Sequence, residues 1–250
     1  MEILKELLKK KELAIFLLMV SLLVIAFIFS DRIQQLLGLK PVPSSQTEEA
    51  IPSYTGRPLD EYRETPEEVK LFTEEQKGIL RGQIQSLAAA IRANPDSLDP
   101  WLRLGITKKV IGDFEGARDA WEYASFIRPQ NVISFRNLGE IYWHYLPDYP
   151  RAEANLRKAI ENDSSYVDVY ITLSELYRYS YTEKADLADD VLLEGFSKNP
   201  EKAHDFLAYL GRYYKETGNT AKAIEYFEKL LLVDPGNADT KDELRKLRSR

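Results

Sequence analysis

One arrangement of small and large residues occurs four times between residues 98 and 237. In each unit a leucine precedes a small residue, and the small residues recur at intervals of 34 to 37 positions. They are Gly105, Gly139, Ser174 and Gly211, and each is followed twelve to fourteen residues later by Ala117, Ala152, Ala188 or Ala223. Small residues at matched positions allow two helices to pack closely. The spacing therefore predicts four stacked helical hairpins.

Each unit ends at a residue that interrupts a helix. Pro129, Pro200 and Pro235 occupy the same place in the first, third and fourth units. A helix cannot continue through proline without losing a backbone hydrogen bond, so these residues predict the turn to the next unit. The second unit has Ser164 there, and we expect Asp163 and Ser164 to end one helix and cap the next.

This arrangement resembles the tetratricopeptide repeat (TPR), a hairpin of two helices. The resemblance implies an all-α fold, a right-handed superhelical solenoid. It assigns residues 69–238 to a TPR domain, with a half or degenerate repeat at 69–97 and full repeats at about 98–131, 132–166, 167–202 and 203–237. Leu87, Ala90 and Pro95 stand on repeat positions in the half repeat. Residues 239–250 are charged and are expected to form a C-terminal capping helix.

Residues 13–30 form a run of eighteen uncharged and almost entirely apolar residues. At about 1.5 Å per residue, a helix of this length covers roughly 27 Å, close to the hydrocarbon thickness of a bilayer. We expect it to run on to about residue 39 and to cross the lipid bilayer once as a signal anchor. A cleaved signal peptide and a buried helix of a soluble core are the two alternatives.

The segment before this run, residues 1–12, contains four lysines, and few basic residues follow the run. The positive-inside rule therefore places the amino terminus in the cytoplasm. We expect a single-pass protein of the cell membrane with an extracytoplasmic TPR domain. Residues 40–68 contain five prolines and several charged residues, a composition that predicts a flexible Pro-rich linker.

Composition argues against several functional classes. The formal net charge of −6 makes a nucleic-acid partner unlikely, and the chain has no cysteine. His144 and His204 are the only histidines, and they are far apart in the sequence. The glycines form no phosphate-binding motif. We therefore expect no enzyme activity, no cofactor, no metal site and no small-molecule substrate.

In TPR proteins the first helix of each hairpin lines a concave groove, so the resemblance implies binding of peptides or partner proteins. The outward positions of the first helices provide a candidate peptide-binding groove. Its residues are Arg136, Asn137, Glu140, His144, Glu175, Arg178, Tyr179, Tyr209 and Arg212. The arginines only half match the clamp that holds a terminal carboxylate. The alternative is that they form ordinary surface salt bridges with Glu140 and Glu175.

Two functions remain open at the level of sequence. The first is a membrane-anchored scaffold for protein–protein interaction. The second is an accessory subunit of an envelope enzyme system, because residues 94–124 also resemble the repeat segment of proteins that present apocytochrome during cytochrome c maturation.

Overall fold

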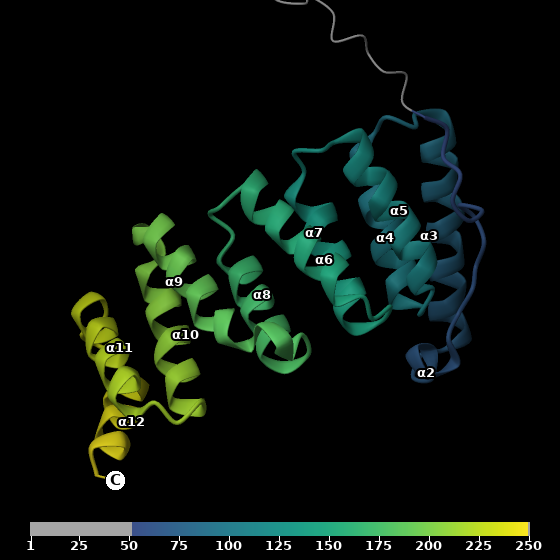
Figure 1. The fold of residues 1–250 in the computed structure, drawn as a ribbon. Coiled ribbons are helices and arrows are strands. Elements are labelled where there is room, and N and C mark those ends of the chain that lie inside the picture. Colours follow the sequence, from purple (N-terminus) through teal and green to yellow (C-terminus); the bar gives the residue numbers. More distant parts are fainter. Residues whose placement is uncertain (1–51, 250) are drawn as a thin grey trace, which may run out of the picture. The chain divides into compact units, whose positions relative to one another are not determined.

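The computed structural model describes residues 52–249. Every regular element in that range is a helix, and successive helices stack beside one another (Figure 1). The predicted segments 1–12 and 13–30, and the first part of the predicted linker, lie outside the described residues. Among the helices of residues 52–249, none combines the length and apolarity that a membrane crossing requires.

The four repeats fold as antiparallel helix pairs. These are α4 (Leu98–Val110) with α5 (Phe114–Ile127), α6 (Val132–His144) with α7 (Tyr149–Asn162), α8 (Val167–Tyr179) with α9 (Ala188–Lys198), and α10 (Ala203–Glu216) with α11 (Thr220–Val233). Two 3-10 turns, η1 (Thr182–Leu187) and η2 (Pro200–Lys202), flank α9. A further helix, α12 (Ala238–Arg248), buries Leu244 and Leu247 against the end of the stack.

Each hairpin closes where the predicted small residue faces a large one. A Cβ atom on Gly139 would lie 2.5 Å from Cγ of Leu156, and a Cβ atom on Gly211 would lie 2.5 Å from Cδ1 of Phe227. Both distances are shorter than a carbon–carbon contact permits. Ser174 fits because its hydroxyl donates a 2.7 Å hydrogen bond to the carbonyl of Ala188. The predicted close approach of the helices is therefore confirmed.

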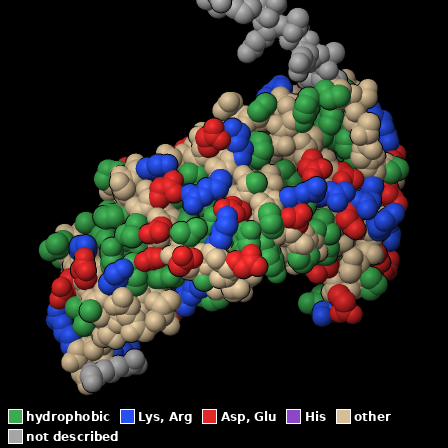
Figure 2. All heavy atoms as spheres, viewed as in Figure 1, with side chains coloured by type: hydrophobic (Ala, Val, Ile, Leu, Met, Phe, Trp, Pro, Cys, Tyr) green, Lys and Arg blue, Asp and Glu red, His purple; other side chains and the backbone are tan. Residues whose placement is uncertain are grey.

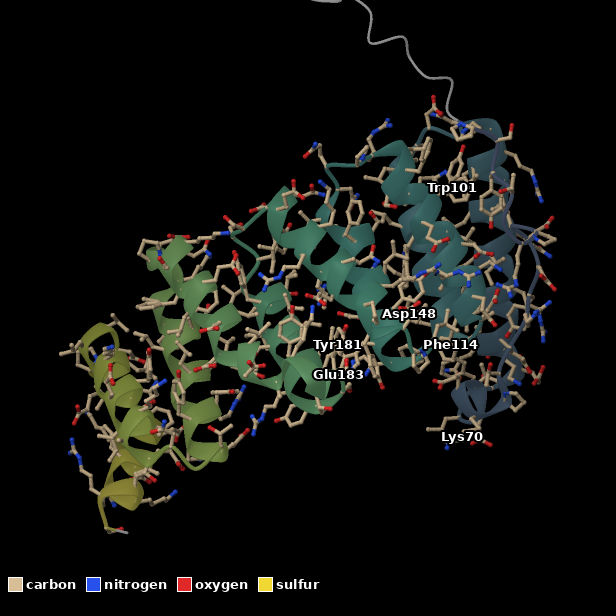
Figure 3. The ribbon with its side chains drawn as sticks, viewed as in Figure 1. Lys70, Trp101, Phe114, Asp148, Tyr181 and Glu183 are labelled. Carbon is tan, nitrogen blue, oxygen red and sulfur yellow. The ribbon has the colours of Figure 1, made fainter. Side chains whose placement is uncertain are left out.

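The helix ends use side-chain caps and two glycine turns. Asp113, Asp148 and Asn219 accept hydrogen bonds from backbone N–H groups in the first turns of α5, α7 and α11. Gly112 and Gly218 have positive φ angles of 79° and 81°, which glycine adopts without steric cost. The within-pair turns lie along one edge of the stack, where Figure 3 labels Phe114, Asp148, Tyr181 and Glu183.

The turn after the second repeat differs in part from the sequence expectation. Asp163 follows the end of α7 and accepts a 2.9 Å hydrogen bond from the N–H of Ser165. The next helix, α8, starts after Tyr166 with no side-chain cap. The capping of α8 by Asp163 or Ser164 was therefore predicted wrongly, because the chain makes a local turn before the helix begins.

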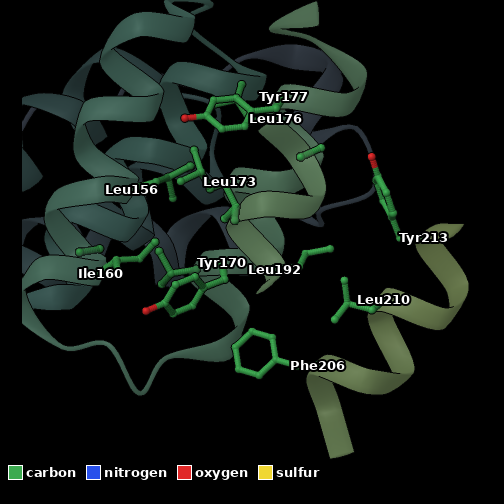
Figure 4. Close-up of a cluster of buried hydrophobic side chains, with 14 of the residues drawn as sticks. Leu156, Ile160, Tyr170, Leu173, Leu176, Tyr177, Leu192, Phe206, Leu210 and Tyr213 are labelled. Carbon is green, nitrogen blue, oxygen red and sulfur yellow. The ribbon is translucent and has the colours of Figure 1, made fainter. Parts of the chain in front are cut away.

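One hydrophobic core continues from each repeat into the next. Leu156 and Ile160 of α7, Leu173 of α8 and Leu210 of α10 belong to the same buried cluster (Figure 4). Tyr170 and Phe206 meet edge to face, with ring centroids 5.7 Å apart. Since each repeat packs against its neighbour through such side chains, burial rather than isolated helix propensity stabilises the stack.

A tyrosine three residues after the small residue connects each later repeat to the preceding one. Tyr142, Tyr177 and Tyr214 donate hydrogen bonds of 2.6 to 2.7 Å to Glu122, Glu153 and Asp189, respectively, which lie on the preceding second helices. Burial, followed by the neighbouring carboxylate, raises the pKa of Tyr142 to about 12 and that of Tyr177 to about 12. These phenols therefore remain neutral hydrogen-bond donors at physiological pH.

Lys108 occupies the tyrosine position in the first repeat and is almost fully buried. Its ammonium lies 2.7 Å from the equally buried carboxylate of Asp113 and donates a 2.9 Å hydrogen bond to the carbonyl of Glu61. A buried charge is tolerated only when it is paired and hydrogen-bonded. Lys108 therefore attaches the segment before the repeats to the first hairpin.

The linker prediction is wrong for the described residues 54–68. Tyr54 packs on Trp101 with ring centroids 5.0 Å apart, and the Thr65 N–H donates a 2.8 Å hydrogen bond to the carbonyl of Ile111. Leu59 is buried, and the short helix α2 (Pro66–Val69) follows. The prolines suggested mobility, but apolar side chains at intervals along this segment bury themselves against α4 and α5.

The half repeat consists of one long helix, α3 (Glu74–Ala93), which packs against α4. Within residues 52–249 no full first helix precedes it, since α2 has only four residues. Ala90, at the repeat position where Ala124 is fully buried in α5, is exposed. The exposure has a simple cause: no helix covers that side of α3 in the described part of the chain.

Replacing Gly139 with leucine is expected to destabilise the fold by about 1–3 kcal/mol, because the new side chain overlaps Leu156. The thermal midpoint, followed by circular dichroism, should fall by several degrees. Gly78→Ala is the matched control. A Cβ on Gly78 has nothing within 4 Å, so this change should stabilise α3 by up to about 1 kcal/mol. An unchanged midpoint for Gly139→Leu would contradict the role of close approach.

Lys108→Met should cost about 3 kcal/mol of unfolding free energy, because it leaves the Asp113 carboxylate buried without its cation. Lys70→Met is the control. Lys70 is exposed and pairs with Glu67 at 3.6 Å, so its loss should change stability by less than about 0.5 kcal/mol. Urea unfolding of the two variants measures the difference, and equal values would refute a structural role for the buried pair.

Candidate protein-binding face

The outward positions of α4, α6, α8 and α10 form what we call the first-helix face. At its α6 end, Arg136 lies between two carboxylates, 3.3 Å from Glu140 and 2.7 Å from Asp168 of α8. Glu140 also pairs with Lys109 of α4 at 3.2 Å. Arg136 and Glu140 are thus brought together, and their charges are largely neutralised within the protein.

Arg178 and Tyr179 lie at the end of α8. The Arg178 guanidinium pairs with Glu216 of α10 at 2.8 Å and lies over the rings of Tyr179 and Tyr213, at 4.7 and 5.3 Å. Tyr179 is 57% exposed. Stacking of a guanidinium on aromatic rings creates a flat surface that is both apolar and cationic.

Glu175 of α8 forms a second group with Tyr209 and Arg212 of α10. Tyr209 donates a hydrogen bond to Glu175, and Arg212 lies 4.4 Å above the Tyr209 ring. Burial, followed by the bond to Glu175, raises the pKa of the Tyr209 phenol, while Arg212 acts in the opposite direction. The phenol therefore stays protonated, and Arg212 remains exposed on the surface above it.

Asn137 and His144 complete the predicted set on α6. Asn137 is half-buried, and its amide makes no hydrogen bond to any of residues 52–249. The His144 ring stacks on Trp143 at 3.9 Å and is otherwise exposed. Removal of water from the ring lowers the pKa of His144, Lys109 lowers it further, and Glu140 and Glu175 oppose the shift. His144 is therefore a neutral, stacked surface residue at physiological pH.

No arrangement typical of catalysis or metal binding occurs in the described range. Residues 52–249 contain no group of three histidine or acidic side chains that could hold a metal ion. The shifted pKa values on the first-helix face belong to side chains in hydrogen bonds or ring stacks, such as Tyr209 and His144. Their arrangement suits packing and recognition rather than proton transfer.

Comparisons with known proteins agree with this geometry. Residues 204–237 match the sequence model of the tetratricopeptide repeat. The crystal structure of MamA superposes with a TM-score of 0.51 at 20% sequence identity, covering 74% of this chain and 99% of that one. The described residues therefore have the stacked helix-pair fold of TPR proteins.

A second solved structure supports the same fold. The C-terminal part of a TPR repeat-containing protein from Cytophaga hutchinsonii superposes with a TM-score of 0.51 at 22% identity, covering 68% of this chain and 69% of that one. No curated protein matches the sequence. At these identities the similarity shows the shared TPR fold, and function must be argued from the residues of this chain.

The stack also contains ion pairs between repeats that the sequence analysis missed. Basic residues of one first helix pair with acidic residues of the next first helix, or of α12, 28 to 38 positions later in the chain. The pairs are Lys109–Glu140, Arg136–Asp168, Arg178–Glu216 and Lys215–Glu243. Asp168, Glu216 and Glu243 had not been identified. Aligning the repeats could have revealed them, because each acid follows its base by about one repeat length.

These pairs determine the charge of the face. Figure 2 shows acidic and basic side chains interspersed rather than separated by sign. The alternative raised by the sequence was that these arginines form ordinary surface salt bridges. Arg136 and Arg178 do form salt bridges, but with Asp168 and Glu216 as well as the predicted Glu140. Arg212, which stacks on Tyr209, provides the more accessible cation.

Proposed function

We propose that this TPR protein is a membrane-anchored scaffold that binds a segment of another protein on its first-helix face. The observation that supports this function is the group of aromatic and cationic side chains at α8 and α10. Tyr179 is largely exposed, Arg178 stacks on it, and Arg212 lies exposed on Tyr209. Tyrosine and arginine combine large contact area with hydrogen-bonding groups, and both are enriched at protein interfaces.

The chemistry of the bound segment follows from these groups. The Asn137 amide offers a donor and an acceptor that suit a peptide backbone. The Tyr179 and Tyr209 rings suit apolar side chains, and the arginines add a local preference for an acidic residue beside them. A purely acidic ligand would gain less, because Glu216 and Asp168 already neutralise Arg178 and Arg136. A segment of mixed apolar and acidic character therefore fits best.

The anchor in this proposal is the apolar run at residues 13–30, with the lysine-rich residues 1–12 in the cytoplasm. The TPR domain would then lie outside the cytoplasm, connected through residues 40–51. Tyr54 and Thr65 contact the first repeat, which supports a connection to the anchor that ends near Tyr54.

A photo-reactive amino acid at position 179 should produce a discrete crosslinked partner in living cells. The exposed position of Ala154 on the second helix α7 is the matched control and should not yield that adduct. The double variant Arg178→Glu, Glu216→Arg exchanges the two charges. It retains the ion pair but moves the cation from position 178 to position 216. We expect it to reduce the adduct several-fold with an unchanged melting curve. Identical adducts at positions 179 and 154 would exclude the first-helix face as the binding surface.

A reporter enzyme that is active only outside the cytoplasm, fused after Arg250, should be active. A cytoplasm-specific reporter at the same position should be silent, because the lysines of residues 1–12 keep that end inside. The opposite pattern would reverse the proposed topology, and activity recovered in the soluble extracytoplasmic fraction would indicate a cleaved signal peptide.

A further inference from the structure

The helix α3 is a second helix without a first helix among the described residues. Its residues Gln83, Ser86, Leu87 and Ala90 stand 34 positions before Ala117, Ala120, Trp121 and Ala124 of α5. In α5 those four positions are at most 1% exposed, because α4 covers them. In α3 the same positions line an open groove.

This groove lies where the first helix of the half repeat would pack, between α3 and α4. Its volume is about 540 Å³, and α4 forms its other wall. The lining residues from α4 are Asp99, Pro100, Arg103, Ile106 and Thr107, of which Ile106 is 48% exposed. In the next repeat the corresponding space, between α5 and α6, is filled by α4 itself. The fold of the chain therefore indicates that a helix belongs in the groove.

Helix α3 lines the groove with uncharged residues. Its basic residues turn to the other side, where Lys77 pairs with Glu64, Arg81 lies over Tyr62 and Arg92 pairs with Asp60. Gln83, Ser86 and Ala90 line the groove, and Ile79, one helical turn before Gln83, is 56% exposed. Gly82 lies on the edge of this side, and a Cβ on it would meet nothing within 4 Å. An exposed apolar helix face of this kind is typical of an interface.

We propose that the groove is filled by α3 of a second copy of this chain, in a twofold-symmetric dimer. A first helix runs antiparallel to its second helix, and two copies of α3 related by a perpendicular twofold axis are antiparallel too. The α3 helix also has the residues that a first helix needs. Gly82 of the second copy can face Leu87 as Gly105 faces Trp121 within the first repeat.

The symmetry of this arrangement pairs large residues with small ones. When Gly82 faces Leu87 of the second copy, the antiparallel register places Ile79 opposite Ala90 and Gln83 opposite Ser86. The same contacts form twice, once on each side of the axis. Leu102, three residues before Gly105, is the residue of α4 that corresponds to Ile79, three residues before Gly82. The dimer thus reproduces the small-and-large pairing that closes each hairpin.

Other occupants fit the groove less well. Residues 13–30 are apolar on every side, whereas a helix in this groove needs one apolar face and one polar face. Residues 40–51 contain Pro41 and Pro43, which interrupt a helix. A helix from a different protein would need no particular register with α3, so the predicted register distinguishes it from a second copy.

Cysteine crosslinking tests the register directly, because the natural chain has no cysteine. Full-length Ile79→Cys and Ala90→Cys chains with different tags are co-expressed and oxidised in the membrane. We expect a disulfide-linked dimer that contains both tags. The control pairs Ala90→Cys with Leu232→Cys, an exposed position on α11, and should give no dimer. Absence of the first product, or equal amounts of both, would overturn the proposal.

A second measurement distinguishes a dimer formed through α3 from copies that are held together by a membrane anchor alone. Ala90→Arg places a charge in the groove, while Gln85→Arg places the same charge on the opposite, exposed side of α3. The purified full chain in detergent should be a dimer by light scattering. Ala90→Arg should raise the dimer dissociation constant at least roughly tenfold, since the long arginine side chain would overlap Ile79 of the second copy, which the register places opposite Ala90. Gln85→Arg should leave it unchanged. A monomeric natural chain, or equal effects of the two changes, would refute a dimer through α3.

Discussion

Close approach of two helices at a residue without a bulky side chain is the constraint on which this structure depends. Gly139 and Gly211 have no space for a Cβ atom beside Leu156 and Phe227, and Ser174 fits only because its hydroxyl binds the Ala188 carbonyl. In the first, second and fourth hairpins a large side chain of the second helix therefore packs directly against the glycine of the first helix. This contact brings the two helices close together, and the hairpins then stack on one another.

The two ends of the stack are covered in different ways. At the carboxyl end α12 covers the last hairpin with Leu244 and Leu247 and presents charged residues outward. At the amino end the chain has Lys108 where later repeats have a tyrosine, and its ammonium holds both Asp113 and the carbonyl of Glu61. The segment before the repeats is consequently part of the domain. It covers one side of α3 and leaves the other side, along the groove with α4, exposed in residues 52–249.

The same ion pairs stabilise the stack and limit what its surface can bind. Lys109, Arg136, Arg178 and Lys215 each pair with an acid on the helix that stacks next along the chain, so most of the positive charge of the first-helix face is neutralised within the protein. The remaining recognition groups are the Tyr179 ring, the stacked Arg212 and the Asn137 amide. A face of this kind selects a partner by shape and by hydrogen bonding more than by net charge.

The periodic pattern predicted the all-helical stack, because a small residue at a fixed spacing has one simple structural use. It also identified the outward positions of the first helices. Two of the predicted pairs are in contact: Arg136 pairs with Glu140, and Tyr209 bonds to Glu175. It failed at residues 54–68, where proline content suggested a linker. It also missed Asp168 and Glu216, because each residue was considered within its own repeat, whereas the partner of each base lies about one repeat length further along the chain.

The sequence by itself thus determined the helix pairs, their close approach at Gly139 and Gly211, and the break after each pair, since these depend on local sterics that residue type decides. The tertiary structure alone decided that Lys108 is buried, that residues 54–65 pack on the first repeat, and that Ala90 lies in an open groove. The reason is physical: burial and charge pairing depend on neighbours that are distant in the chain, and only the packed stack brings those neighbours together.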